Sequence, residues 1–214
     1  MSHSSQVEIE RKYDVGEHVE VPDLVGARPI AVVEAVEVVE LTAVYFDTAE
    51  LHLARGRTAL RRREGGSDAG WHIKSKQPAD EGRTELHWPL ETGGGGQEDV
   101  PAEVRAKVEH LAGTHALHPV ARVVNHRENR RLLDAAGYPV AELSDDHVRA
   151  ENLIDGSQRA WREWEVELLA AAPDTRAKRA KLLDSIESIL LDAGAEISAS
   201  SSKVARALGI DVSV

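Results

Sequence analysis

Residues 7–14 read Val-Glu-Ile-Glu-Arg-Lys-Tyr-Asp, an alternation that predicts a β-strand with one charged face. Glu8, Glu10 and Lys12 share that face, and the opposite face is apolar except for one arginine. The apolar face must meet a core. The charged face would ordinarily look at water, unless other strands bring complementary charges to the same side.

Four later segments repeat this alternation with charges that complement the first strand. Their inward candidates are Arg61 and Arg63, Lys74 and Lys76, Arg83 with Glu85 and His87, and Glu163, Glu165 and Glu167. Strands with one charged and one apolar face can build a barrel whose lumen is polar and whose outside is covered. Carboxylates and cations that share one cavity are what a divalent metal and a polyphosphate need.

Composition bounds the class of protein. The chain has 214 residues, and we expect one domain over residues 1–214. Hydrophobic residues make up 42% and aromatic residues only 4%, so aliphatic side chains must build most of the core. The net charge of −11 argues against a nucleic-acid or anionic-membrane partner, although it leaves room for a local cationic cavity.

Cysteine is absent, which excludes disulfides, thiol nucleophiles and zinc–thiolate sites. The first residues lack the basic and apolar regions of a signal peptide, and no apolar run is long enough to span a membrane. We therefore expect a cytoplasmic protein.

The pattern of apolar residues and turn residues predicts many strands and few helices. Expected strands cover 7–14, 41–47, 58–65, 71–76, 83–90, 119–127, 129–134, 140–144, 148–152 and 161–169. The segments 119–127 and 129–134 form either a strand pair or one long bent strand. Helices are expected at 101–111, at 175–193 and after residue 202, with a short helical turn after Asp47, while Gly93 to Gly96 is expected to be a loop.

Taken in order, the charged motifs resemble the CYTH superfamily of triphosphate tunnel metalloenzymes, which includes class IV adenylate cyclases and thiamine triphosphatases. The resemblance covers nearly the whole chain and rests on Glu8-x-Glu10-x-Lys12, Tyr45-Phe46-Asp47-Thr48, Leu60-Arg61-Arg62-Arg63, Ile73-Lys74, Arg83-Thr84-Glu85, Glu165-Val166-Glu167 and Ser202-Lys203. It implies an α+β fold, a closed antiparallel β-barrel with a polar, charged lumen and flanking helices. It also implies triphosphate substrates and a Mg²⁺ or Mn²⁺ cofactor.

The resemblance assigns roles to individual residues. It implies catalytic roles for Glu8, Glu10, Lys12 and Glu85. Metal ligands would be Glu8, Glu10, Asp146, Glu165 and Glu167. Substrate-binding cations would be Lys12, Arg61, Arg63, Lys74, Arg83, Arg122, Arg127 and Lys203.

Two of these assignments have competitors. Arg122 and Arg127 lie on opposite faces of one expected strand unless a bulge intervenes, and Arg127 is favoured. Asp146 shares a face with Glu142 and is favoured over Asp145.

Simpler interpretations apply to several other residues. Arg62 lies between Arg61 and Arg63 on one strand, so the alternation of side chains places it outside the barrel. The ten histidines show no paired metal-binding spacing, and His115 is expected at the surface, whereas His72 and His87 share faces with tunnel candidates.

The sequence thus predicts a metal-dependent hydrolase of triphosphate compounds, with inorganic triphosphate as the first choice and in-line attack by a metal-activated water. The alternatives are a cyclase that makes cyclic AMP from ATP and a non-catalytic polyphosphate-binding module. The expected partner is a small triphosphate, and the chain is expected to be a monomer or a homodimer.

Overall fold

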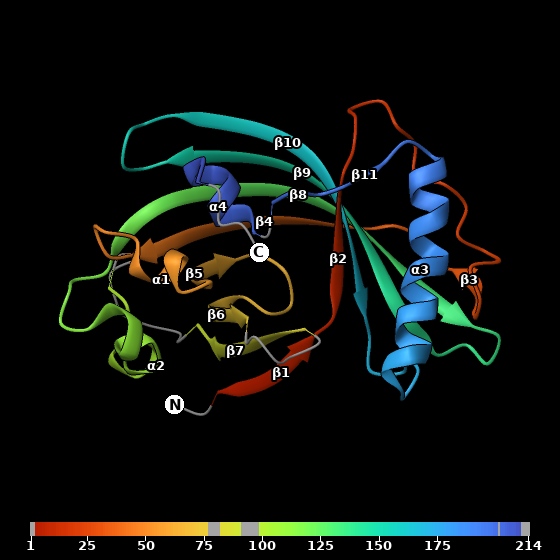
Figure 1. Cartoon of the computed structure of the whole chain (residues 1–214), viewed down its shortest axis with the longest axis horizontal. Coiled ribbons are helices and arrows are strands. Elements are labelled where there is room, and N and C mark those ends of the chain that lie inside the picture. Colours follow the sequence, from red (N-terminus) through yellow and green to blue (C-terminus); the bar gives the residue numbers. More distant parts are fainter. Residues whose placement is uncertain (1–2, 77–81, 91–98, 201, 211–214) are drawn as a thin grey trace.

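The computed structural model describes residues 3–76, 82–90, 99–200 and 202–210, and within these ranges an eleven-stranded sheet curls around a polar interior (Figure 1). The strands are β1 (Ser4–Glu8), β2 (Glu10–Asp14), β3 (Ile30–Val33), β4 (Glu37–Asp47), β5 (Thr58–Glu64), β6 (Gly70–Lys76), β7 (Arg83–Pro89), β8 (His118–Asp134), β9 (Pro139–Asn152), β10 (Gln158–Leu168) and β11 (Glu196–Ile197). The helices are α1 (His52–Arg55), α2 (Ala102–Ala112), α3 (Arg176–Asp192) and α4 (Lys203–Leu208).

The first segment of the chain closes the sheet. The strand order is β1-β7-β6-β5-β4-β8-β9-β10-β2-β11, with β3 beside β8 and antiparallel pairing throughout. β1 pairs with β7 and β2 pairs with β10, yet only Ile9 separates the two strands. The Ile9 carbonyl accepts a hydrogen bond of 2.9 Å from the Leu168 amide, which holds this bend against β10. The expected α+β barrel is therefore confirmed.

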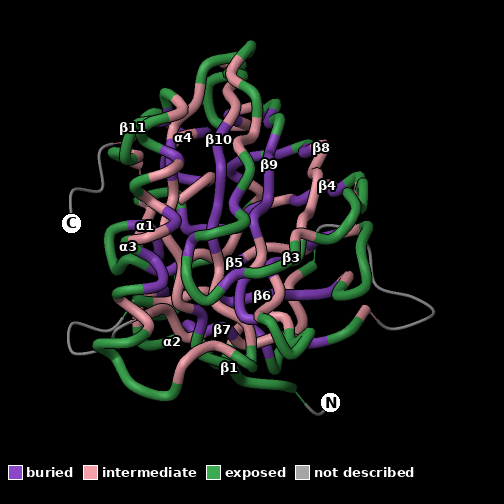
Figure 2. Tube along the Cα trace, turned by 90° about the vertical axis from the view of Figure 1, so that its right-hand side faces the viewer, coloured by how far each residue is buried: buried purple, intermediate pink, exposed green. Residues whose placement is uncertain are grey.

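Helices cover the outside of the barrel because each carries an apolar stripe that the strands' outer faces can bury. α3 packs on the outer side of β2, β8, β9 and β10 through Leu182, Leu183, Ile186 and Leu190. α1 and α2 pack on the outer side of β4 to β7. Figure 2 shows the buried stretches running through the middle strands.

α4 differs from the other helices because it packs against inward-facing residues. Its Val204, Ala207 and Leu208 share an apolar cluster with Ala43 and Val123, which also line the interior. The Ser202 hydroxyl accepts a hydrogen bond of 3.2 Å from the Ala205 amide and so caps the helix. α4 therefore plugs one part of the barrel and carries Lys203 inward.

Several element bounds differ from the sequence-based expectation. β9 joins the two strands expected at 140–144 and 148–152, and ion pairs of Asp145 and Asp146 with neighbouring strands hold the residues between them in the sheet. β8 is one strand of 17 residues, which confirms the second of the two alternatives for 119–134. Strands β3 and β11 were not foreseen, and the Gly93 to Gly96 loop lies outside the described residues. No described helix is both long and apolar enough to cross a bilayer.

Candidate active site in the barrel interior

A cavity of about 540 Å³ lies inside the barrel, and most of the charged residues singled out in the sequence line it. These are Glu8, Glu10, Lys12, Arg61, Arg63, Lys74, Arg83, Glu85, Arg127, Glu165, Glu167 and Lys203. Strand register explains the convergence, since Glu165 lies opposite Lys12 and Lys74 lies opposite Glu85 on adjacent strands. Side chains at alternate positions of every strand then point to one interior.

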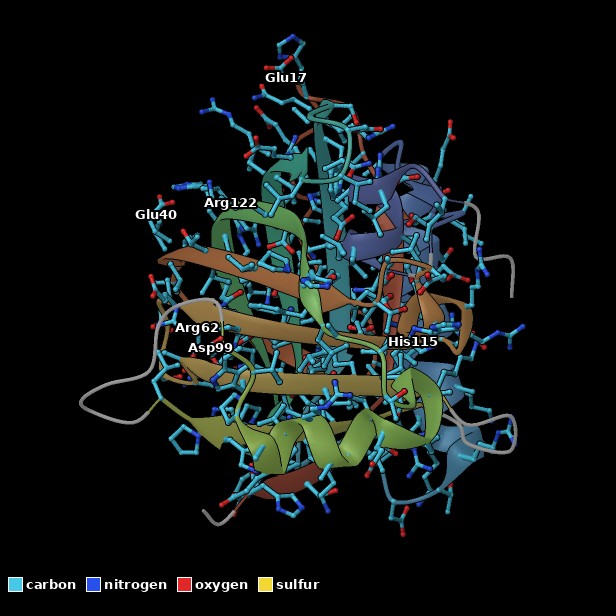
Figure 3. The ribbon with its side chains drawn as sticks, turned by 90° about the vertical axis from the view of Figure 1, so that its left-hand side faces the viewer. Glu17, Glu40, Arg62, Asp99, His115 and Arg122 are labelled. Atoms are coloured by element: carbon cyan, nitrogen blue, oxygen red, sulfur yellow. The ribbon has the colours of Figure 1, made fainter. Side chains whose placement is uncertain are left out.

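Arg122 and Asp146 do not line this cavity, and for Arg122 the structure contradicts the predicted inward position. Arg122 lies opposite Val44 on the outer face of the sheet, where its side chain is 54% exposed and 3.8 Å from the Glu151 carboxylate (Figure 3). No bulge falls between Arg122 and Arg127, so strand parity keeps them on opposite faces. Arg127 is the one that faces the cavity.

The choice between the two aspartates is also settled by the structure. Asp146 is fully buried on the inner side, where Arg127 donates to it through Nε and Nη2 at 2.7 and 2.6 Å. Asp145 points the other way and binds the Arg162 guanidinium at 2.8 and 2.7 Å.

The deep side of the cavity is a compact network of opposite charges. The Lys203 ammonium lies 2.7 Å from Asp146, 2.5 Å from Glu163 and 2.7 Å from Glu165. The Glu165 carboxylate also contacts Lys12, and it accepts a hydrogen bond of 2.6 Å from Arg127. These three cations balance three buried carboxylates.

These cations lower the pKa values of two of the buried carboxylic acids. Burial opposes ionisation of Glu165, but Lys12, Lys203 and Arg127 hold its pKa well below the usual range. Burial acts the same way on Asp146, and Arg127 and Lys203 lower its pKa to about 2. Both groups are thus ionised and engaged by side-chain cations. Oxygens of Asp146, Glu163 and Glu165 come within 4.8 Å of one another, but the Lys203 ammonium lies among them, where a metal ion would have to be.

Two other acids of the cavity have raised pKa values. Burial raises the pKa of Glu8 to about 7, with help from Glu85 and Glu167, although Lys74 lies only 2.5 Å from Glu8. Burial, followed by repulsion from Glu10 and other carboxylates, likewise raises the pKa of Glu167 to about 7. Each acid is therefore only partly ionised near neutrality, because burial outweighs the attraction of Lys74.

The carboxylates of Glu8, Glu10 and Glu167 suit a divalent cation. Mg²⁺ and Mn²⁺ prefer hard oxygen ligands, and all three groups line the same cavity from β1, β2 and β10. A bound dication would favour the ionised forms of Glu8 and Glu167. The residue types present here therefore fit a divalent cation, whereas at Asp146 and Glu165, which the sequence also proposed as ligands, the Lys203 ammonium lies against the carboxylates.

The two inward arginines of β5 differ in their surroundings. Burial, together with the positive charges of Arg61 and Arg127, lowers the pKa of Arg63 to about 9, although Arg63 contacts Asp68. Arg61 donates to the Tyr45 hydroxyl at 3.5 Å and lies 3.7 Å from Glu85, and, against the effect of burial, both neighbours raise its pKa. Guanidinium groups gathered in one cavity can bind an anionic ligand.

Replacing Arg61 and Arg62 separately tests which of these β5 side chains points into the cavity. Arg61→Ala is expected to raise KM or lower kcat for a triphosphate by about 10-fold or more, because a cavity cation is lost. Arg62→Ala is expected to change neither, since Arg62 pairs with Glu64 at 2.5 Å and lies outside the cavity lining. Steady-state kinetics with thermal melts measure both. Equal losses for the two variants would refute this facing.

The cavity residue Gln6 was not singled out by sequence reasoning. It donates to Glu8 at 3.3 Å and to Glu85 at 3.1 Å, so its amide bridges two carboxylates. His72, which the sequence placed on the same strand face as Lys74, is 1% exposed and lies outside the cavity lining. Its ring lies 2.9 Å from Glu85 and 3.0 Å from the Asp68 carbonyl, so it supports the Glu85 carboxylate.

Comparison with known proteins supports the same family. A family model described as the CYTH domain matches residues 6–206. The uncharacterized protein Rv2226 of Mycobacterium tuberculosis strain H37Rv is 40% identical over 215 residues, covering 95% of this chain and 40% of that protein. Protein MT2285 of strain CDC 1551 matches with the same values. The chain thus spans about two fifths of the length of these relatives.

Solved structures share the fold. A crystal structure described as a candidate adenylate cyclase from Bacillus halodurans aligns with a TM-score of 0.61 at 19% identity, over 94% of this chain and 97% of that one. The PH1819 protein from Pyrococcus horikoshii aligns with a TM-score of 0.50 at 18% identity, over 94% and 96%. The family match over residues 6–206 establishes that the chain belongs to the CYTH domain family.

Proposed function

We propose that this chain hydrolyses small triphosphate compounds with the help of a divalent metal, and that inorganic triphosphate is its preferred substrate. The observation that carries the proposal is that one cavity is lined both by the carboxylates of Glu8, Glu10 and Glu167 and by the cations Arg61, Arg63, Lys74 and Arg83. Burial raises the pKa of Glu8 and Glu167 and lowers the pKa of Arg63, so it disfavours the charged form of each. A metal on the carboxylates and a triphosphate on the cations would favour those charged forms.

The cations of the cavity are suited to binding and orienting the phosphates. A triphosphate carries roughly four to five negative charges near neutral pH, which several Arg and Lys side chains must neutralise. Arg61 and Arg63 from β5, with Lys74 and Arg83 from β6 and β7, line one side of the cavity. Planar guanidinium groups can bind two phosphate oxygens at once, which would fix the chain of phosphates in one direction.

Glu8, Glu10 and Glu167 would hold the metal. When bound, Mg²⁺ or Mn²⁺ supplies charge neutralisation at phosphoryl oxygens and lowers the pKa of a coordinated water. The deep network gives the cavity a rigid wall, because Arg127 and Lys203 are held by two or more carboxylates each. Little covalent chemistry is then required of the protein, since phosphoryl transfer depends mainly on positioning and charge stabilisation.

The cavity also has an apolar wall, which the sequence-based account omitted. Leu41, Ala43 and Tyr45 of β4 line it, together with Val123 of β8. Ala43, Tyr45 and Val123 also pack in the cluster around α4, and Leu41 is 7% exposed. A purine would need an open slot with placed donors and acceptors. These packed side chains favour the inorganic substrate over a nucleotide.

We therefore expect the enzyme to recognise the triphosphate group of its substrate rather than a nucleobase. We expect kcat/KM for inorganic triphosphate to exceed that for ATP by about 10-fold or more, because the nucleoside adds bulk but few contacts. Phosphate release measured with a panel of triphosphates and Mg²⁺ or Mn²⁺ checks this. A higher value for ATP would reverse the expected order.

The same panel separates the alternatives. Cyclic AMP as the main product from ATP would identify a cyclase. Binding of triphosphate by calorimetry without any turnover would identify a polyphosphate-binding module. Orthophosphate release that stops in excess chelator and resumes with added Mg²⁺ or Mn²⁺ supports the hydrolase.

A further inference from the structure

Three side chains that can ligate a metal meet outside the barrel, and two of them closely follow the Tyr45-Phe46-Asp47-Thr48 segment. Glu50 lies in the turn between β4 and α1, His52 begins α1, and His115 follows α2. One ligand atom from each lies within 4.8 Å of the other two. Figure 3 labels His115 beside the C-terminal end of α2. Tertiary packing of α1 against α2 brings together donors that are 63 residues apart.

The distances leave room for an ion between the donors. Glu50 Oε2 is 3.7 Å from His115 Nδ1 and 4.0 Å from the nearer nitrogen of the His52 ring, and both separations exceed a hydrogen bond. The two imidazole rings have centroids 4.9 Å apart. A tetrahedral zinc ion with ligands at about 2.0–2.1 Å holds its donors about 3.3 Å from one another. Small rotations of partly exposed side chains would close the difference.

One of the histidines is already oriented by a neighbour. His52 Nδ1 lies 2.9 Å from the Thr48 hydroxyl, which also accepts a hydrogen bond of 3.1 Å from the His52 amide. Thr48 is fully buried, and the adjacent Asp47 carboxylate accepts hydrogen bonds from the Leu53 and Ala54 amides of α1. This hydrogen bond engages Nδ1 and leaves Nε2 of His52 as the nitrogen that can bind a metal, an arrangement common among metal-binding histidines. These hydrogen bonds hold the turn that carries Glu50 and His52 in one conformation.

We propose that Glu50, His52 and His115 form a second metal site that takes a borderline divalent cation such as Zn²⁺, with water completing the coordination. Two imidazoles and one carboxylate favour Zn²⁺ over Mg²⁺ or Mn²⁺, which prefer sites made of oxygen alone. The site is therefore chemically distinct from the carboxylates of the cavity.

The site lies where it can stabilise one wall of the tunnel region. Ala54 of α1, with the following Arg57 and Thr58, lines a recess that Lys74 and Arg83 also line. A metal that joins His52 to His115 would fix α1 against the segment after α2. The ion would thus stabilise α1 and the residues after it, which line this recess.

Isothermal titration of the full chain with ZnCl₂ tests the site without any activity assay. The wild-type chain is expected to bind Zn²⁺ with micromolar affinity, and His115→Ala to weaken binding at least about 10-fold. His115 is 55% exposed, so its replacement leaves the core intact. His110→Ala, an exposed histidine on α2 outside the cluster, is the matched control and should bind as wild type.

A Glu8→Gln variant separates this site from the tunnel. It is expected to retain Zn²⁺ binding and a Zn²⁺-dependent rise of a few degrees in Tm, a rise that His115→Ala loses. No Zn²⁺ binding by the wild-type chain, or equal binding by wild type and His115→Ala, overturns the proposal. So does loss of binding in Glu8→Gln with full binding in His115→Ala, which would place the ion in the cavity.

Discussion

Replacing Glu8 with glutamine is expected to lower triphosphate hydrolysis at least about 100-fold while the protein remains folded. The substitution removes a negative charge from the carboxylates that would hold the metal but keeps the volume and one oxygen, which can still accept from Lys74. The fold should tolerate the change, since the pKa of Glu8 is about 7 and its neutral form is already accommodated. Glu10→Gln should behave in the same way.

Metal-titrated kinetics and thermal melts measure this effect. Glu17→Gln, at an exposed position outside the cavity lining, is the matched control and should retain full activity. Activity of the wild-type chain that persists in excess chelator, or a Glu8→Gln enzyme with normal turnover at saturating metal, would remove the metal role from this residue.

The second large effect is expected at Arg127, with Arg122 on the same strand as its matched control. Arg127→Ala should destabilise the protein by about 3 kcal/mol, because the fully buried Asp146 loses its bidentate partner and keeps only Lys203. Arg122→Ala should stay within about 0.5 kcal/mol of wild type, since its side chain is half exposed and pairs weakly. Urea denaturation measures both.

Arg127→Lys separates binding from stability. It keeps the charge but cannot bind Asp146 and Glu165 through a planar fork, so KM for triphosphate is expected to rise about 10-fold in a folded protein. Arg122→Ala should leave kcat and KM unchanged. Comparable losses at Arg122 and Arg127 would contradict the assignment of Arg127 to the inner face of β8 and Arg122 to its outer face.

The alternation of side chains along each strand explains which site residues could be predicted from the sequence. Alternate residues of a strand point to opposite faces, so Glu8 with Glu10 and Arg61 with Arg63 could be placed on one side from the sequence alone. The apolar spacing of the 175–193 segment similarly predicted α3 and its buried stripe. The position of Arg122 could not be decided this way, because a bulge in the strand would have reversed its facing.

What the sequence by itself determined is therefore local: which residues form strands, which face of each is charged, and which family the ordered motifs match. The tertiary structure decided everything that depends on register and closure. Register between β8 and β9 set Arg127 opposite Asp146, and α4 brought Lys203 among three carboxylates. Packing of α1 on α2 brought His52 to His115, for which no spacing in the sequence gave a signal. The physical reason is that charge neutralisation and metal coordination depend on distances of a few ångströms between segments, and only the folded chain sets those distances.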